Sequence, residues 1–231
     1  MNRRHTLTAG ILYLVTFAAI PAQLLYGPLK AGTQASMTAA HWGALLEVVV
    51  ALACIGTAVA LFPVVRRVGE ARALGFVGAR TLEAAMIFMG VALMLTLMAH
   101  PDDRGLLTTY DAAFLLGQSL MPGINALLLG SLLYQARLVP RVIPLVGLIG
   151  APIHLTAVVL TLFGVVSPLS PVTALAALPI AAWEFALGVH LVVKGTRSDL
   201  VRHHPGVQHV EAPQDDFQPQ AGCCVAERAA E

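Results

Sequence analysis

The sequence contains little charge: Asp, Glu, Lys and Arg make up only 12% of its 231 residues, against about 25% in soluble domains. Hydrophobic residues make up 57% of the chain, and its mean hydropathy is +0.76. A soluble domain of this length cannot enclose so much apolar surface, so we expect contact with a lipid bilayer. The basic residues are scattered rather than clustered, which argues against a nucleic-acid partner.

Cysteine is also scarce, with Cys54 inside an apolar run and Cys223 and Cys224 near the C-terminus. This spacing is neither a disulfide framework nor a metal-binding motif. The chain has no His-Glu-x-x-His motif, no nucleophile elbow and no phosphate-binding loop. We therefore place an enzyme last among the candidate functions, name no catalytic residue, and expect neither a metal nor a cofactor.

Long apolar runs are abundant, and each is about 20 residues or more, enough to cross a core ~30 Å thick as an α-helix. The first run resembles a signal peptide but exceeds the usual length and contains Pro21, so we interpret it as a retained span. We predict an all-α, polytopic membrane protein, with a bundle of six transmembrane helices in residues 1–197. The predicted spans are 7–29, 41–65, 73–98, 107–136, 142–166 and 172–193.

The basic residues between these runs predict the orientation, because cytoplasmic loops are enriched in Lys and Arg. With the N-terminus inside, the outside loops hold only Lys30 and Arg104. We therefore expect a multi-pass protein of the plasma membrane with both termini cytoplasmic, and a disordered cytoplasmic tail at 198–231. The inside segments hold Arg3, Arg4, Arg66, Arg67, Arg72, Arg137, Arg141, Lys194, Arg197 and Arg202.

Arg80 and Glu83 lie inside the third apolar run, near the expected midplane of the bilayer. Counted from Arg72, they are about 12 and 16 Å deep at the helical rise. Each central charge costs roughly 2.5–3.5 kcal/mol of insertion free energy, while the apolar residues of this run return only about 3–6 kcal/mol. The two charges should therefore pair with each other, being three residues apart, or face a wet cavity.

Other spans carry polar residues at similar depths. Glu184 lies in the middle of the sixth run, and Glu47 lies in the second. In the fourth run, Asp111, Gln118 and Asn125 are spaced by seven, which places them along one face of an α-helix. We identify these residues as candidate ligand-binding groups, together with Arg80 and Glu83.

The predicted spans contain one permanent cation, Arg80, and four carboxyl groups. These are Glu47, Glu83, Asp111 and Glu184. If these groups meet, the surplus carboxylates must be protonated, exposed to water or paired with a bound cation. We therefore expect an open or semi-open polar centre that binds a proton, a cation or a small polar molecule.

Several segments that contain these polar residues resemble an uncharacterised bacterial membrane family, known as domain of unknown function (DUF) 4386. The resemblance covers roughly residues 7–197. It implies a six-helix membrane protein, and brings no activity, substrate or catalytic residue with it. The matching segments are 10–17 (GILYLVTF), the run 43–63 that begins GALLE and ends FP, 79–83 (ARTLE), 122–125 (PGIN), 132–134 (LLY), 183–184 (WE) and 194–195 (KG).

Three functions remain open at this point. The first is a transporter-like or ligand-sensing protein that uses the Arg80 centre. The second is a structural or accessory protein, in a homo-oligomer or a membrane complex, whose buried Arg–Glu pairs only fix helix packing. The third is an intramembrane enzyme with Glu83 or Glu184 as general base.

Overall fold

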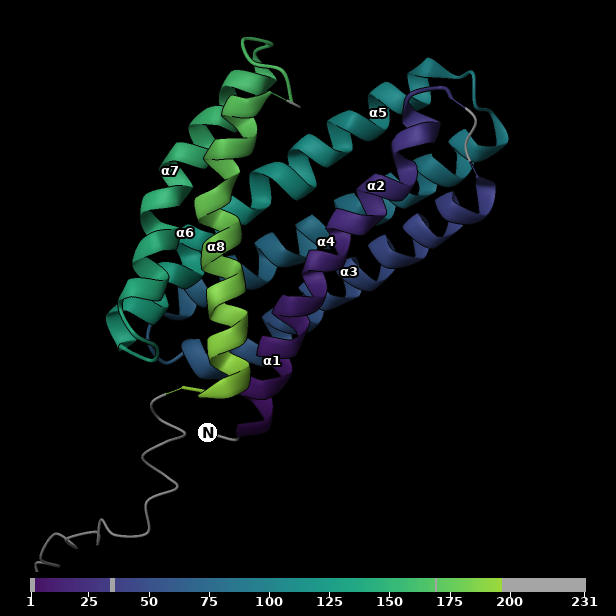
Figure 1. Cartoon of the computed structure of the whole chain (residues 1–231). Coiled ribbons are helices and arrows are strands. Elements are labelled where there is room, and N and C mark those ends of the chain that lie inside the picture. Colours follow the sequence, from purple (N-terminus) through teal and green to yellow (C-terminus); the bar gives the residue numbers. More distant parts are fainter. Residues whose placement is uncertain (1–2, 34–35, 169, 197–231) are drawn as a thin grey trace, which may run out of the picture.

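The computed structural model describes residues 3–33, 36–168 and 170–196, and its regular elements are all helices (Figure 1). Six helical segments are long and apolar enough to cross a membrane, so the predicted all-α architecture with six spans is confirmed. The predicted tail at 198–231 lies outside the described residues. The spans are, in order, α1 (Arg3–Val15) with η1 (Thr16–Ala18) and α2 (Ala19–Lys30); α3 (Met37–Val65); α4 (Glu70–Ala99); α5 (Arg104–Phe114) with η2 (Leu115–Ser119) and α6 (Leu120–Ala136); α7 (Val142–Leu162); and α8 (Pro171–Val193).

The six spans close into a ring in chain order, since each packs against the next and α8 packs back onto α1. The third span, α4, therefore lies across the ring from the sixth, α8. Figure 1 shows the start of α1 and the end of α8 together at one end of the bundle, which we call the termini end. There the Arg3 guanidinium donates to the carbonyl oxygens of Leu191 (2.7 Å) and Val192 (2.5 Å), the last carbonyls of α8.

At the opposite end, which we call the far end, polar side chains cap the helices that begin there. The Asp103 carboxylate accepts hydrogen bonds from the amides of Gly105 (2.9 Å) and Leu106 (3.2 Å) at the start of α5. Ser170 caps α8 in the same way through the amide of Thr173 (3.2 Å). These caps satisfy N–H groups that the first helical turn leaves without partners.

Large apolar side chains cover the outside of the ring. Leu52, Leu82 and Leu178 on three different spans are each at least 50% exposed. A surface of this kind is typical of helices that face lipid, and it places the protein in a bilayer as a multi-pass membrane protein.

The fourth span is not a uniform α-helix. A π-helical turn, η2, separates α5 from α6, and such turns leave a backbone carbonyl free to bond elsewhere. Here the Ser119 carbonyl oxygen lies 2.7 Å from Nε2 of the buried His154 on α7. The turn also changes the angular spacing of side chains before and after it, which affects the polar stripe predicted on this span.

Small residues let α7 and α8 approach closely where Glu184 is held. The indole of the buried Trp183 lies over Gly147, so that a Cβ at residue 147 would stand only 2.7 Å from Trp183 Cδ2. This contact fixes the rotation of α8 about its axis. It thereby directs the neighbouring Glu184 towards the interior.

We predict that Gly147→Ala lowers the thermal stability of the purified protein, because the added methyl group overpacks the contact with Trp183. Overpacking of this kind typically costs about 1–3 kcal/mol. Gly78→Ala is the matched control, because a Cβ there meets nothing within 4 Å and alanine favours a helix interior. Equal melting temperatures for the two variants would contradict the packing described here.

Candidate functional site

Six of the seven predicted polar residues lie in two buried clusters inside the ring. The inner cluster is centred on Arg80, whose side chain is 1% exposed. Arg80 Nη1 donates to Glu83 Oε2 and Nη2 donates to Glu184 Oε1, both at 3.0 Å. One guanidinium from α4 is thus shared between a carboxylate on its own helix and one on α8, across the ring.

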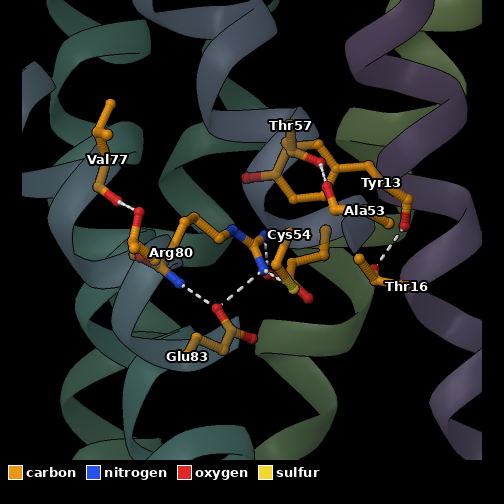
Figure 2. Close-up of polar contacts among 11 residues, drawn as sticks. Tyr13, Thr16, Ala53, Cys54, Thr57, Val77, Arg80 and Glu83 are labelled. Carbon is orange, nitrogen blue, oxygen red and sulfur yellow. Dashed lines mark hydrogen bonds and ion pairs between the residues drawn. The ribbon is translucent and has the colours of Figure 1, made fainter. Parts of the chain in front are cut away.

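The surroundings of the guanidinium are filled. Figure 2 shows Arg80 bonded to Glu83, with Cys54 and Tyr13 beside it. The Tyr13 ring centroid lies 4.9 Å from Arg80 Cζ, a cation–π contact, and Cys54 Sγ lies 3.5 Å from Nη1. The expectation of an open centre is therefore not met around Arg80 itself, because an aromatic ring and a thiol occupy the space. Glu184, at 13% side-chain exposure, lies at the edge of the cluster.

Asn125 joins the same cluster from α6. Its Nδ2 donates to Glu83 Oε2 at 2.8 Å, so that this one oxygen accepts from both Asn125 and Arg80. Two polar atoms in the cluster, Arg80 Nε and Asn125 Oδ1, are buried without a hydrogen-bond partner in the protein. Buried groups of this kind normally bond to something, including water or a ligand.

The outer cluster is centred on Glu47 of α3 and lies towards the far end. Glu47 is completely buried. Its Oε1 accepts from Nε2 of Gln23 (2.8 Å), Nε2 of Gln118 (3.1 Å) and the hydroxyl of Tyr110 (3.2 Å). Gln118 therefore contributes to this cluster, whereas Asn125, on the same span, contributes to the inner one.

Asp111 belongs to neither cluster. Its side chain is 52% exposed and forms an ion pair with Lys30 at 3.0 Å, at the far end of the bundle. The predicted stripe assumed α-helical spacing from Asp111 to Asn125, but the π-helical turn η2 lies between Asp111 and Asn125. Of that stripe, only Gln118 and Asn125 make hydrogen bonds to the buried carboxylates.

The sequence did not single out the tyrosines that complete these clusters. Tyr13 stacks on Arg80, and Tyr110 bonds to Glu47. Tyrosines within apolar spans were an available signal, because a buried phenol usually forms a hydrogen bond. Among the described residues, no group of three or more His, Cys, Asp or Glu side chains could hold a metal ion.

The comparisons with known proteins define the family. The model of the family described as domain of unknown function (DUF4386) matches residues 8–195, which include both clusters. No curated protein and no solved structure matches the chain. Because the match covers most of the sequence, the chain belongs to the DUF4386 family of proteins of unknown function.

Proposed function

We propose that this protein is a transporter-like or ligand-sensing membrane protein that takes up a proton or another positively charged ligand at the Arg80 cluster. The observation that carries the proposal is the sharing of one buried guanidinium by two carboxylates from opposite sides of the ring. The family has no assigned function, so the proposal depends on the geometry and charges of the site alone.

The charges of the inner cluster do not balance. Arg80 supplies one positive charge, whereas Glu83 and Glu184 together supply two negative charges when both are ionised. An uncompensated charge in an apolar interior is costly, so a second positive charge is favoured there. A proton on one carboxyl group meets this need without any cavity, which suits a cluster as closely packed as this one.

A change at Glu184 would act on the whole bundle. The ion pair between Arg80 and Glu184 links α4 to α8, which lie across the ring from each other. Neutralising Glu184 weakens this link, while the pair of Arg80 with Glu83 remains within α4. Proton uptake at Glu184 can therefore bias the separation of two opposite spans, as a transporter or a sensor requires.

A structural role is the second candidate, and the enclosure of Arg80 favours it. At 1% exposure, with both ion pairs at 3.0 Å, the arginine resembles a residue that holds helices in register. Removing one partner from a buried ion pair typically costs about 3–5 kcal/mol. The two roles therefore differ in what loss of a single carboxylate should do.

We predict that Glu184→Gln melts close to the wild-type protein, because its amide oxygen still accepts from Arg80 and the charges of the cluster then balance. The double variant Glu83→Gln/Glu184→Gln leaves the guanidinium without an anionic partner and should lose about 3–5 kcal/mol of stability. Thermal unfolding in detergent measures both. A single Glu184→Gln variant as unstable as the double variant would favour the structural role.

We also predict that proteoliposomes containing the wild-type protein respond to an imposed pH gradient or to a ligand, and that Glu184→Gln removes the response. The measurement is the signal of an internal pH-sensitive dye, with thermal stability screened in parallel against inorganic and small organic cations. A saturating ligand at 100 times its Kd would stabilise the protein by about 2.7 kcal/mol. If neither assay separates wild type from Glu184→Gln, the proposal of transport or sensing fails.

We further propose that the termini end faces the cytoplasm of a plasma membrane, which the distribution of basic residues supports. Lys30 and Arg104 lie at the far end, where α2 ends and α5 begins, whereas Arg3 lies at the termini end. In a background with Cys223 and Cys224 replaced by serine, we expect an impermeant thiol reagent to label Arg104→Cys and not Arg67→Cys on intact cells. The reverse pattern would overturn this orientation.

A further inference from the structure

The outer cluster lies apart from the Arg80 site along the bundle axis. Glu47 and Cys54 are seven residues apart on α3, and Gln118 and Asn125 are seven apart on the fourth span. Seven residues of helix rise by about 10.5 Å. Between the two levels lies an apolar layer formed by the buried residues Val50, Ala51, Ala84 and Ile87. The two clusters are therefore separate sites.

Within the described residues, no cation pairs with the carboxyl group of Glu47. The three groups that bond to its Oε1 are amides and a phenol, which carry no charge of their own. Lys30, towards the far end, pairs with Asp111 at 3.0 Å and lies 4.8 Å from the centroid of the Tyr110 ring. Among the described residues, Glu47 forms no ion pair although it is completely buried.

The second oxygen of this carboxyl group differs from the first. Glu47 Oε2 and the Tyr26 hydroxyl are both buried, and neither has a hydrogen-bond partner in the protein. Tyr26 interacts electrostatically with Glu47 and packs edge-to-face on Tyr110 at a centroid distance of 6.1 Å. A carboxylate here would leave a charged oxygen buried without a donor, which is costly. A neutral carboxyl group with O–H at Oε2 can instead donate to the Tyr26 oxygen, while Oε1 remains the accepting oxygen.

We propose that Glu47 is a second proton-binding site, separate from the Arg80 cluster, which carries its proton on Oε2 next to the Tyr26 hydroxyl. Release breaks the Oε2–H bond and transfers the proton to a water molecule. The carboxylate that remains keeps the three donors on Oε1, which stabilise its negative charge. The site needs no oxidant or co-reactant.

The groups that face Glu47 direct this exchange towards the far end. The titratable groups that face Glu47 are Tyr26 of α2 and Tyr110 of α5. On the far side of Tyr110, Lys30 lies 4.8 Å from the ring centroid and pairs with Asp111. The described neighbours on α4 in this region, such as Val91 and Met94, are apolar. Since the apolar layer closes the other side, the route for the proton and the water that accepts it runs towards the far end, where Lys30 pairs with the exposed Asp111.

A metal cation fits the site less well than a proton does. Hard cations such as Na⁺ and K⁺ are bound by several oxygen atoms. At Glu47, two of the nearest groups direct amide N–H donors at the carboxyl oxygen instead. Donors of this kind compete with a metal ion for the same lone pairs.

The test is infrared spectroscopy of the full chain in lipid, because the C=O stretch of a protonated carboxyl group is resolved from carboxylate bands. A protonated carboxyl group in the Arg80 cluster contributes a component of its own to this band. We therefore expect Glu47→Gln to remove one component of the wild-type band, and the matched control Glu184→Gln to retain that same component. The control separates this site from the Arg80 cluster, so either proposal can fail without the other. Glu47→Gln should melt like the wild type, since a carboxamide closely matches a neutral carboxyl group in shape.

A second variant keeps the test valid if Glu47→Gln does not fold. Tyr26→Phe removes the hydroxyl beside Oε2 and should shift the band without abolishing it. A wild-type spectrum without a protonated-carboxyl band, or a band unchanged in both Glu47→Gln and Tyr26→Phe, would overturn the proposal. Stabilisation by Na⁺ or K⁺ that is lost in Glu47→Gln would overturn it in favour of a bound cation.

Discussion

The Arg80 guanidinium connects four of the six spans. It lies 1% exposed in the interior and contacts α1 through Tyr13, α3 through Cys54, and α8 through Glu184. In an apolar bundle these contacts cannot be exchanged for contacts with bulk water, so loss of one leaves a buried charge incompletely paired. The arrangement of the ring around its centre therefore depends on keeping this charge satisfied.

The two ion pairs of Arg80 differ in how they depend on helix positions. Glu83 is joined to Arg80 within one helix and also accepts from Asn125, whereas Glu184 reaches Arg80 from across the ring. The first pairing is local and survives movement of the helices. The second depends on the position of α8, which the contact between Trp183 and Gly147 helps to set. Helix packing and charge satisfaction are thus linked at Glu184.

The Glu47 cluster solves the same physical problem by different means. In the part of the chain that the structure describes, no cation pairs with Glu47, and neutral donors from two other spans surround one of its oxygens. The small and apolar side chains between the clusters, such as Ala51 and Ala84, keep the two carboxyl sites apart. The sequence indicated one polar centre at the midplane, because its polar residues lie at similar depths. The structure has two acidic sites at different levels of the bundle, since residues at similar depths on different spans need not be in contact.

The sequence by itself determined the features that depend on local spacing and hydropathy. Six apolar runs specify six spans, because a backbone that crosses a bilayer must form all its hydrogen bonds internally, as a helix or a closed barrel does. The spacing of three residues on one helix likewise places Arg80 next to Glu83. Tertiary structure alone decided which distant groups meet. It placed Glu184 on Arg80 because the ring sets α8 opposite α4, it joined Glu47 to Tyr110 and Gln118, and it left Asp111 exposed at the far end. Contacts between spans depend on helix order and rotation, and rotation here depends on a π-helical turn and on close glycine contacts that hydropathy does not encode.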